Sequence, residues 1–475
     1  MKSLIQPCRQ LLFGSLLVMA ASASHGQTVA PPDPEAARIQ AIAEEAYIFG
    51  LPIVIDYRVM YSYAIDTGNR EYKAPFNQIK TVNTLLTPAD VAIPYPNNDT
   101  LFAMGWLDVR AEPVVISLPE VEPGRYYSLM LVDGTGLNYG ILGTRSSGRE
   151  AGDYLIVGPD WQGETPEGIS RVLRLPTQFG LALTRVQVVG EEDVARVNAI
   201  QAQVRIRTLS AYTGSAPPPA AAAIDFPPID DELARKNFFA YLDFALQFQP
   251  ARPEDQDIRA RLASIGIGNG NFDEFRAIAA KYPGELMAGV QAGNQKIDQA
   301  VASASPPVDG WSWTQSALDI DSASYGGNAL KRAALARFGP YGLNAHEARY
   351  VLTTALANGE RIDASSHNYT LTFAADQLPP VDAFWSVTAY DCETRSFMPN
   401  PLKRYLINSP MLPRLKRNPD QSLTLHLRKD SPGIGWENNW LPVSGPVCLM
   451  LRTYGPREPI LRGEWKVPPV VRADG

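Results

Sequence analysis

Apolar residues recur at helical spacing near the start of the chain. Between Ile39 and Phe49 the apolar side chains stand three and four positions apart, which predicts one buried face of a helix. Gly50 and Pro52 follow at once, and both residue types disfavour the interior of a helix. We therefore expect this helix to end near residue 50.

The hydrophobic pattern changes from about residue 80 onward. Short apolar runs, separated by turn residues, cover 114–118, 126–132, 154–157 and 181–189. Runs of this length with turn signals at short intervals are typical of antiparallel strands. We expect an antiparallel sandwich in this part of the chain.

A proline- and alanine-rich segment at 213–228 predicts a linker. Asp230 or Asp231 then stands where a helix cap is expected, before apolar residues at helical spacing. Two further helices are predicted at 258–262 and 272–282, and the helical stretch ends near residue 305.

Strand patterns return in the last third of the chain. A helix is expected around 344–356, before strand-like runs at 369–373, 384–390, 422–427 and 447–454. No sequence repeat at a fixed period is visible, which disfavours a solenoid or a propeller.

The length of 475 residues and the composition favour several domains with many turns. The sequence contains 40 prolines and 36 glycines, and so long a chain is expected to form two or three cores. We predict a mainly β fold with a helical insert. The expected parts are a signal peptide (1–26), a flexible start (27–36), an N-terminal β-sandwich domain (37–212), a linker (213–228), a helical domain (229–305) and a C-terminal strand-rich domain (306–475).

The first 26 residues have the order of a secretory signal peptide. Lys2 and Arg9 precede an apolar run at 11–20, and small residues follow, with cleavage expected after Ala23 or Gly26. An apolar run of about 10 residues is too short to span a bilayer as a helix. We expect a periplasmic or secreted protein, and the alternative is an uncleaved anchor.

The formal net charge of −7 argues against partners that are themselves negatively charged. Removal of the predicted signal peptide would take away two basic residues and no acidic residue, so the remaining chain is more acidic. Repulsion between like charges argues against nucleic acid or an anionic membrane surface as partner. No later run is apolar for long enough to insert into a membrane. The sequence does not decide whether the protein forms a homo-oligomer.

Motifs for cofactors and metals are missing from the sequence. There is no phosphate-binding loop, no dinucleotide fingerprint and no nucleophile elbow. His346, His367 and His426 form no metal-binding spacing, and the pair Asp319 and Asp321 is interpreted as a solvated loop. We therefore predict no cofactor and no metal.

After signal cleavage, Cys392 and Cys448 would be the two remaining cysteines. Both fall in strand-like runs. In an oxidising compartment such a pair can form a disulfide between neighbouring strands. Two buried free thiols are the alternative.

Several motifs resemble a known bacterial family. They are Pro94–Phe102, Gly124–Ser128, Gly143–Arg145, Leu378–Tyr390, Arg404–Tyr405, Asn438–Pro442 and Leu451–Pro456. In this order they are similar to an exported family that combines two domains of unknown function, numbered 1254 and 1214. The resemblance implies an N-terminal immunoglobulin-like β-sandwich, a small α-helical domain and a C-terminal jelly-roll-like β-sandwich. It implies no established reaction.

Two aspartates in the N-terminal part are catalytic candidates. Asp99, with Asn98 beside it, either shapes a turn or lines a cleft, where a carboxylate and an amide can hold a ligand or move a proton. Asp133 stands at the end of a strand, where sandwich loops gather. Arg145 lies in a loop, and its guanidinium either binds an anionic ligand or pairs with an aspartate of the same domain.

The C-terminal candidates are binding residues. Asn439 and Trp440 stand before a proline, where an exposed indole would stack on a sugar or aromatic ring, or anchor the loop in the core. Arg404 and Arg452 either contact a ligand or bridge the domains. These residues lead to three hypotheses: a hydrolase or lyase acting on a small organic or carbohydrate-derived compound, a non-catalytic ligand-binding module, or a structural envelope protein.

Overall fold

The structure is a computed structural model that describes residues 33–90 and 94–473. The predicted signal peptide and residues 27–32 of the predicted flexible start lie outside the described residues. Residues 34–36 of that start are helical, because α1 begins at Pro34 with Asp33 as its N-cap.

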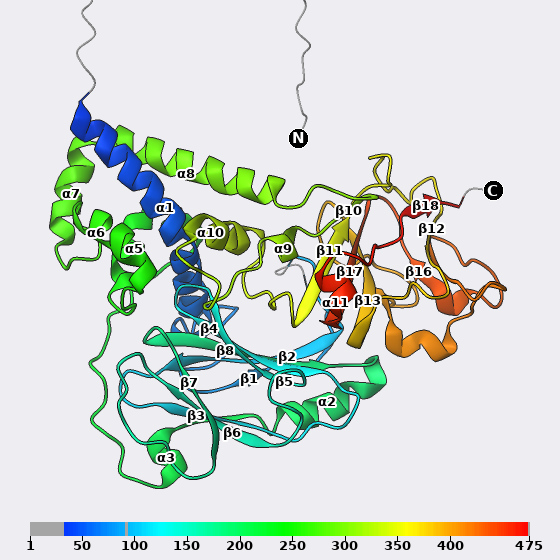
Figure 1. Cartoon of the computed structure of the whole chain (residues 1–475), viewed down its shortest axis with the longest axis horizontal. Coiled ribbons are helices and arrows are strands. Elements are labelled where there is room, and N and C mark those ends of the chain that lie inside the picture. The colour runs from blue at the N-terminus through cyan, green and yellow to red at the C-terminus, as the bar shows by residue number, and fades with distance from the viewer. Residues whose placement is uncertain (1–32, 91–93, 474–475) are drawn as a thin grey trace, which may run out of the picture.

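The N-terminal strands form two sheets that pack face to face (Figure 1). The first sheet has the order β1-β2-β8-β4-β5 and the second β7-β6-β3-β9, and every pair except β6 with β7 is antiparallel. Leu129 of the first sheet and Ile156 of the second belong to one buried cluster. The strands are β1 (Lys80–Thr81), β2 (Thr100–Asp108), β3 (Val114–Leu118), β4 (Tyr127–Asp133), β5 (Asn138–Gly143), β6 (Gly152–Val157), β7 (Ile169–Arg174), β8 (Phe179–Gln187) and β9 (Arg205–Thr208).

Two short helices accompany this sandwich, α2 (Val194–Gln201) and α3 (Leu209–Thr213). The strands expected at 114–118, 126–132, 154–157 and 181–189 are all present, with bounds that move by one to two residues at most ends.

Most of the other helices lie above the N-terminal sheets and beside the C-terminal strands in the view of Figure 1. Helix α1 packs against α5, α8 and α10, although it precedes the first sandwich in the chain. The helices are α1 (Pro34–Met60), which continues as a π-helical turn (Tyr61–Ile65), then α4 (Asp231–Lys236), α5 (Phe238–Leu246), α6 (Gln256–Ala263), α7 (Phe272–Lys281), α8 (Pro283–Ser303), α9 (Thr314–Ala317) and α10 (Ala329–Phe338).

The predicted end of the first helix is wrong. Gly50 and Pro52 both lie inside α1, which continues for another two turns. A Cβ atom on Gly50 would lie 2.7 Å from Leu242 Cδ2, so this glycine allows α5 to approach closely. Burial among three helices outweighs the low helix propensity of the two residues.

The C-terminal strands also form two packed sheets, of order β10-β11-β17-β13-β14 and β16-β15-β12-β18. Val387 of the first sheet and Leu425 of the second share a buried cluster. The elements are β10 (Trp311–Ser312), β11 (Ala348–Thr353), β12 (Tyr369–Phe373), β13 (Val381–Asp391), β14 (Leu406–Asn408), β15 (Leu423–Arg428), β16 (Trp440–Pro442), β17 (Val447–Pro456), α11 (Glu458–Leu461) and β18 (Val470–Arg472).

The helix expected around 344–356 is wrong, because residues 348–353 form β11 between β10 and β17. The segment from Tyr350 to Thr353 is rich in residues that favour strands, and pairing with β17 decides its conformation. With long helices beside four mostly antiparallel sheets, the fold is mixed α and β, not mainly β. The immunoglobulin-like and jelly-roll-like assignments stay predictions.

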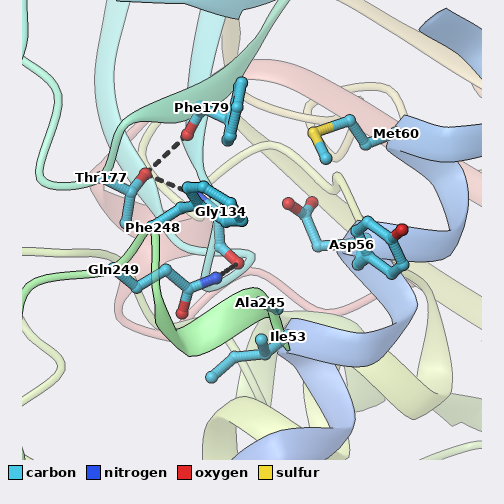
Figure 2. Close-up of a pocket in the computed structure, with 10 residues that line it drawn as sticks. Ile53, Asp56, Met60, Gly134, Thr177, Phe179, Ala245, Phe248 and Gln249 are labelled. Atoms are coloured by element: carbon cyan, nitrogen blue, oxygen red, sulfur yellow. Dashed lines mark hydrogen bonds between the residues drawn. The ribbon is translucent and has the colours of Figure 1, made fainter. Parts of the chain in front are cut away.

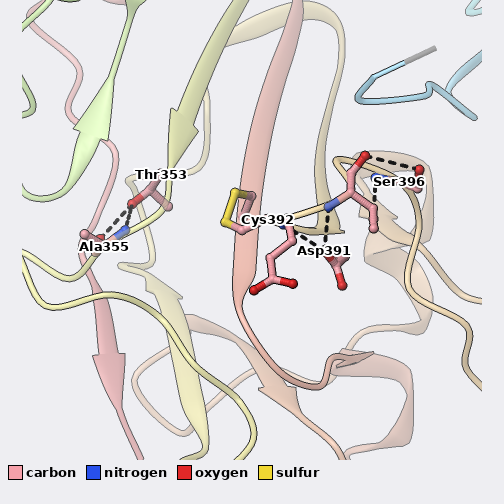
Figure 3. The surroundings of a disulfide bond; sticks show 8 residues. Thr353, Ala355, Asp391, Cys392 and Ser396 are labelled. Carbon is pink, nitrogen blue, oxygen red and sulfur yellow. Dashed lines mark hydrogen bonds between the residues drawn. A yellow bond between two sulfur atoms is a disulfide. The ribbon is translucent and has the colours of Figure 1, made fainter. Parts of the chain in front are cut away.

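Cys392 and Cys448 form a disulfide (Figure 3). Cys448 lies on β17 opposite Tyr390 of β13, and Cys392 follows the end of β13. The bond therefore links the end of β13 to the beginning of the neighbouring strand β17.

One helix of the described residues, Pro34–Ile65, is long and apolar enough to cross a membrane by length and composition. Most of its apolar window is buried against the rest of the protein, as in a core helix.

The outer faces of the two five-stranded sheets meet each other and α1 in one buried cluster. On β4, Leu129 and Leu131 face the sandwich core, whereas Met130 and Val132 face this cluster. Tyr126 packs against Tyr454 of β17, with ring centroids 5.2 Å apart. We call this contact region the junction.

Candidate functional site

Two arginines face the junction from the middle strands of the two sheets. Arg185 of β8 lies between β2 and β4, and Arg452 of β17 lies between β11 and β13. Their side chains are buried, with residue exposures of 7% and 3%. Within the described part of the chain, neither guanidinium has a carboxylate oxygen within 4.0 Å. A buried charge without an ion pair is costly unless another group compensates it.

Each arginine holds the backbone of a tyrosine in the left-handed region. Arg185 Nη2 donates to the carbonyl of Tyr341 over 2.8 Å, and Arg452 Nη2 donates to the carbonyl of Tyr95 over 3.1 Å. The φ angles of Tyr341 and Tyr95 are 61° and 56°. Such angles strain a bulky residue and cluster at functional sites. A guanidinium has five N–H donors, so these bonds leave donors for another acceptor.

Tyr350 of β11 lies opposite Arg452 of β17 in the strand register. Burial raises the pKa of Tyr350, and the positive charges of Arg185 and Arg452 both oppose that rise. Tyr350 also packs against the apolar cluster of the junction, so it lies on the same side of β11 as this site. Its side chain is only partly buried.

Asp99 adds a buried carboxyl beside Arg452. Its Oδ2 accepts a hydrogen bond from Ser386 Oγ over 2.5 Å, while its Oδ1 has no hydrogen-bond partner. Burial raises the pKa of Asp99, and Arg452 and Ser386 only partly oppose this. A carboxyl with a raised pKa can deliver or accept a proton nearer to neutral pH.

Arg145 lies at the rim of the same cluster. Its Nε donates to Glu347 Oε2 over 2.6 Å, and the Tyr126 hydroxyl donates to Glu347 Oε1 over 2.9 Å. The Arg145 side chain is 45% exposed, whereas that of Glu347 is 1% exposed. The ion-pair alternative for Arg145 is therefore observed, but the partner is a glutamate of the C-terminal part instead of an aspartate of its own domain.

Asp56 of α1 is a second buried carboxyl at the junction. Figure 2 shows its carboxyl pointing into a small cavity opposite Gly134 and Thr177. This cavity has a volume of about 20 Å³, and a neighbouring one of about 20 Å³ is lined by Asp56 and Arg332. Each has room for about one water molecule.

Tyr341 links Asp56 to the arginine pair. Its hydroxyl donates to Asp56 Oδ1 over 2.9 Å, while its carbonyl accepts from Arg185. Burial raises the pKa of Asp56 well above its ordinary value, the nearby charge of Asp133 raises it further, and the Tyr341 hydrogen bond opposes the rise. The polar groups thus follow one another across the junction from Asp56, through Tyr341 and the arginines, to Asp99.

Asp133 does not fit the catalytic role predicted for it. It is fully buried and forms an ion pair with Arg252. Its Oδ1 also accepts from the N–H groups of Thr135 and Leu137, over 2.8 Å and 3.2 Å. Oδ1 holds a turn and Oδ2 is bonded to Arg252, so both carboxylate oxygens have structural partners.

Four of the predicted binding residues have their side chains hydrogen-bonded to backbone groups. Asn98 exchanges two hydrogen bonds with the backbone of Leu86. The other three are Arg404, bonded to the carbonyls of Glu437 and Trp440; Asn439, bonded to Lys416 and Thr424; and the buried indole of Trp440, bonded to the carbonyl of Arg428. The core-anchoring alternative therefore describes Trp440, and stacking on a ligand does not.

The sequence interpretation found Asp99, Arg145 and Arg452 and missed Asp56, Arg185, Tyr341 and Tyr350. A signal existed for two of them. Asp56 interrupts the apolar run Ile53–Ile55, and Arg185 stands in the apolar strand Leu181–Val189. A lone charge in a buried element must have a partner or a role. Among the described residues, no group of three or more histidine, cysteine, aspartate or glutamate side chains could hold a metal ion.

Comparisons with known proteins agree with the two-part organisation. Residues 76–208 match the family model "Protein of unknown function (DUF1254)", and residues 347–458 match "Protein of unknown function (DUF1214)". Their order along the chain is the one that the resemblance implies. The junction described above is the contact between them.

Two solved structures are similar to this chain. The VPA0106 protein from Vibrio parahaemolyticus shares 26% sequence identity, with a TM-score of 0.73 over 92% of this chain and 100% of that one. An uncharacterised protein from Burkholderia cenocepacia shares 15% identity, with a TM-score of 0.41 over 94% of this chain and 92% of that one. The search of curated proteins finds no match. The similarity to the Vibrio structure extends over both domains and the helices between them, and none of these descriptions names a reaction.

Proposed function

We propose that this chain is an exported enzyme that binds a small organic anion at the junction and acts on it by hydrolysis or elimination. The observation that carries the proposal is that Arg185 and Arg452 are buried on facing sheets without a carboxylate within 4.0 Å in the described structure. A guanidinium in this situation retains donors for a carboxylate or phosphate group. The chain carries a net negative charge, and still neither of these two guanidinium groups has an ion-pair partner among the described residues.

Asp99 is the proton-transfer group in this proposal. Its raised pKa favours the protonated form, which suits a general acid. In that role Asp99 donates its proton to the leaving group. In hydrolysis the hydroxyl of a water molecule adds to the other fragment and the remaining proton of that water returns to Asp99, whereas in elimination the proton that the substrate loses returns to Asp99. Arg185 and Arg452 hold the anionic group of the substrate, and Tyr350 orients it with its hydroxyl.

Export rests on two observations. The first 26 residues have the order of a signal peptide, and Cys392 is bonded to Cys448, as expected in an oxidising compartment. Expression of the full chain in a bacterial host, followed by fractionation and N-terminal sequencing, tests this part. A periplasmic product that begins near residue 24 or 27 supports it, and a cytoplasmic product with an intact Met1 contradicts it.

The ligand is tested by thermal denaturation of the mature protein with a panel of small carboxylates and phosphate esters. We expect at least one anion to raise Tm in a saturable way. The substitution Tyr350→Phe removes only a hydroxyl and should weaken this effect, and Tyr212→Phe removes a hydroxyl far from the junction and should leave it unchanged. Equal responses of both variants would contradict the site.

Catalysis is tested separately on the anions that bind. Asp99→Asn keeps the shape of the side chain and removes its proton, so turnover should fall by about 100-fold or more while binding persists. Binding without any product, in the wild type as well, would favour the alternative of a non-catalytic ligand-binding module that uses the same two arginines.

A further inference from the structure

A cleft lined by three tryptophans lies in the C-terminal part, on the side of β11 opposite the junction. Its volume is about 190 Å³. Arg349, which lines it, is the neighbour of Tyr350 on β11, and successive strand residues point to opposite faces. The cleft is thus separate from the junction and takes no part in the proposed function.

The walls of the cleft are indole rings held in fixed positions. Trp311 Nε1 donates to the carbonyl of Pro468 over 2.9 Å, and Trp465 Nε1 donates to the carbonyl of Gln377 over 3.1 Å. Both rings are buried, whereas Trp313 is partly exposed. Its indole N–H donates to no group of the described residues, so one ring face and one donor of Trp313 are available to a ligand.

A tight turn places two of these rings on the cleft. Asp309 and Gly310 have φ angles of 51° and 85°, and Val308 and Trp311 exchange hydrogen bonds of 2.8 Å and 2.9 Å on either side of them. A two-residue hairpin with both central φ angles positive suits an Asp-Gly pair. The turn fixes Trp311, and through it Trp313, against the segment that follows α11.

Cations outnumber anions around the cleft. The Arg349 guanidinium lies 5.2 Å from the centre of the Trp313 ring, and its Nη1 donates to the carbonyls of Ile460 and Leu461. Its buried Nε has no hydrogen-bond partner. Lys466 is exposed and forms no ion pair with any described residue, while Asp309 contributes one carboxylate at the rim.

We infer that this cleft binds a single-ring aromatic carboxylate. The indole walls suit a flat apolar ring, and a volume near 190 Å³ has room for one ring, since an engineered cavity of about 150 Å³ holds benzene. Lys466 and the free donors of Arg349 receive the carboxylate. With a neutral ring, Asp309 would remain the one carboxylate of the lining beside these two cations.

Tryptophan fluorescence of the mature protein tests this inference, with benzoate as the probe. We expect saturable quenching by benzoate, weaker quenching by the neutral benzamide, and none by acetate or glucose. Trp313→Leu should weaken benzoate binding by about threefold to tenfold, and Lys466→Met by about twofold to fivefold.

Matched controls are Trp161→Leu and Lys429→Met, which change the same residue types outside the cleft and should leave benzoate binding unchanged. Equal binding of benzoate and benzamide would overturn the role of the cations. Binding that persists unaltered in Trp313→Leu and Lys466→Met, stronger binding of glucose, or no saturable quenching up to the solubility limit of benzoate would overturn the site itself.

Discussion

The Tyr341 hydroxyl donates a hydrogen bond of 2.9 Å to the buried carboxyl of Asp56. This contact fixes the position of a group that burial keeps protonated to unusually high pH. It also connects α1 to the turn that Arg185 holds on the opposite side.

The raised pKa of Asp56 predicts a specific pH dependence of stability. The folded state binds the Asp56 proton more tightly than the unfolded state does. The contribution of Asp56 to the free energy of unfolding is therefore largest below the ordinary aspartate pKa of about 4, and it is lost as the pH rises toward the pKa that Asp56 has in the folded state. Asp56→Asn replaces the carboxyl by a neutral amide, so the variant should lose part of this decline in Tm above pH 4. Asp376→Asn, at an exposed site, serves as the control, and identical Tm profiles for wild type and Asp56→Asn would refute the assignment.

The Arg145–Glu347 contact predicts an asymmetric pair of mutational effects. Arg145→Met leaves the Glu347 charge buried with only the Tyr126 hydroxyl as partner, which should lower the free energy of unfolding by about 1–3 kcal/mol. In the background of Glu347→Gln the same change should cost less than about 1 kcal/mol, because no buried charge remains. Urea unfolding of the four proteins of this double-mutant cycle measures the difference, and additive effects would show that the two side chains are independent.

Helix α8 predicts opposite effects for two glycine substitutions. A Cβ atom on Gly289 would lie 2.5 Å from the carbonyl oxygen of Gln40 on α1, while one on Gly284 would meet nothing within 4 Å. Gly289→Ala should therefore force α1 and α8 apart and destabilise the protein by about 1–3 kcal/mol. Gly284→Ala should be neutral or stabilising by up to about 1 kcal/mol. Equal changes in Tm would mean that the two helices are not in the contact described.

The disulfide predicts a redox-dependent stability. Cys392 and Cys448 are 56 positions apart, and closing a loop of this length stabilises a protein by about 2–4 kcal/mol. The double substitution Cys392→Ala with Cys448→Ala should lower stability by this amount, and dithiothreitol should have a similar effect on the wild type only. A variant that is still sensitive to dithiothreitol would rule out this bond as the cause.

The strands of the first sandwich were well predicted because their apolar runs are short and bounded by turn residues. The strand at Val114–Leu118 is bounded by prolines and has the predicted limits. The predicted end of α1 is too early because the low helix propensity of Gly50 and Pro52 is a local property. It does not include the packing of α5 and α8 against this part of the helix. The prediction of a helix around 344–356 is wrong for the same reason, since the conformation of Ala348–Thr353 depends on β17, about 100 residues later.

The candidate site was predictable only in part. Asp99 and Arg452 stood out as polar residues in distinctive motifs, and the structure places both at the junction. Arg185 and Tyr350 lie in strands whose sequences carry no distinctive motif. They become candidates only because side chains alternate between the two faces of a strand, and because the faces that carry these two residues pack together at the junction. Asp133 was a reasonable candidate by position, but sequence cannot show that Arg252, 119 residues away, neutralises it.

The packing of α1 also constrains how the protein acquires its structure. The carbonyl of Phe49 is bonded to Arg332, 283 positions later in the chain, and Arg38 contacts Ser264 after a separation of 226. An apolar helix made first thus finds its partners last, which raises the contact order and slows folding. We therefore expect part of the buried face of α1 to stay uncovered until α10, its contact partner, has been made.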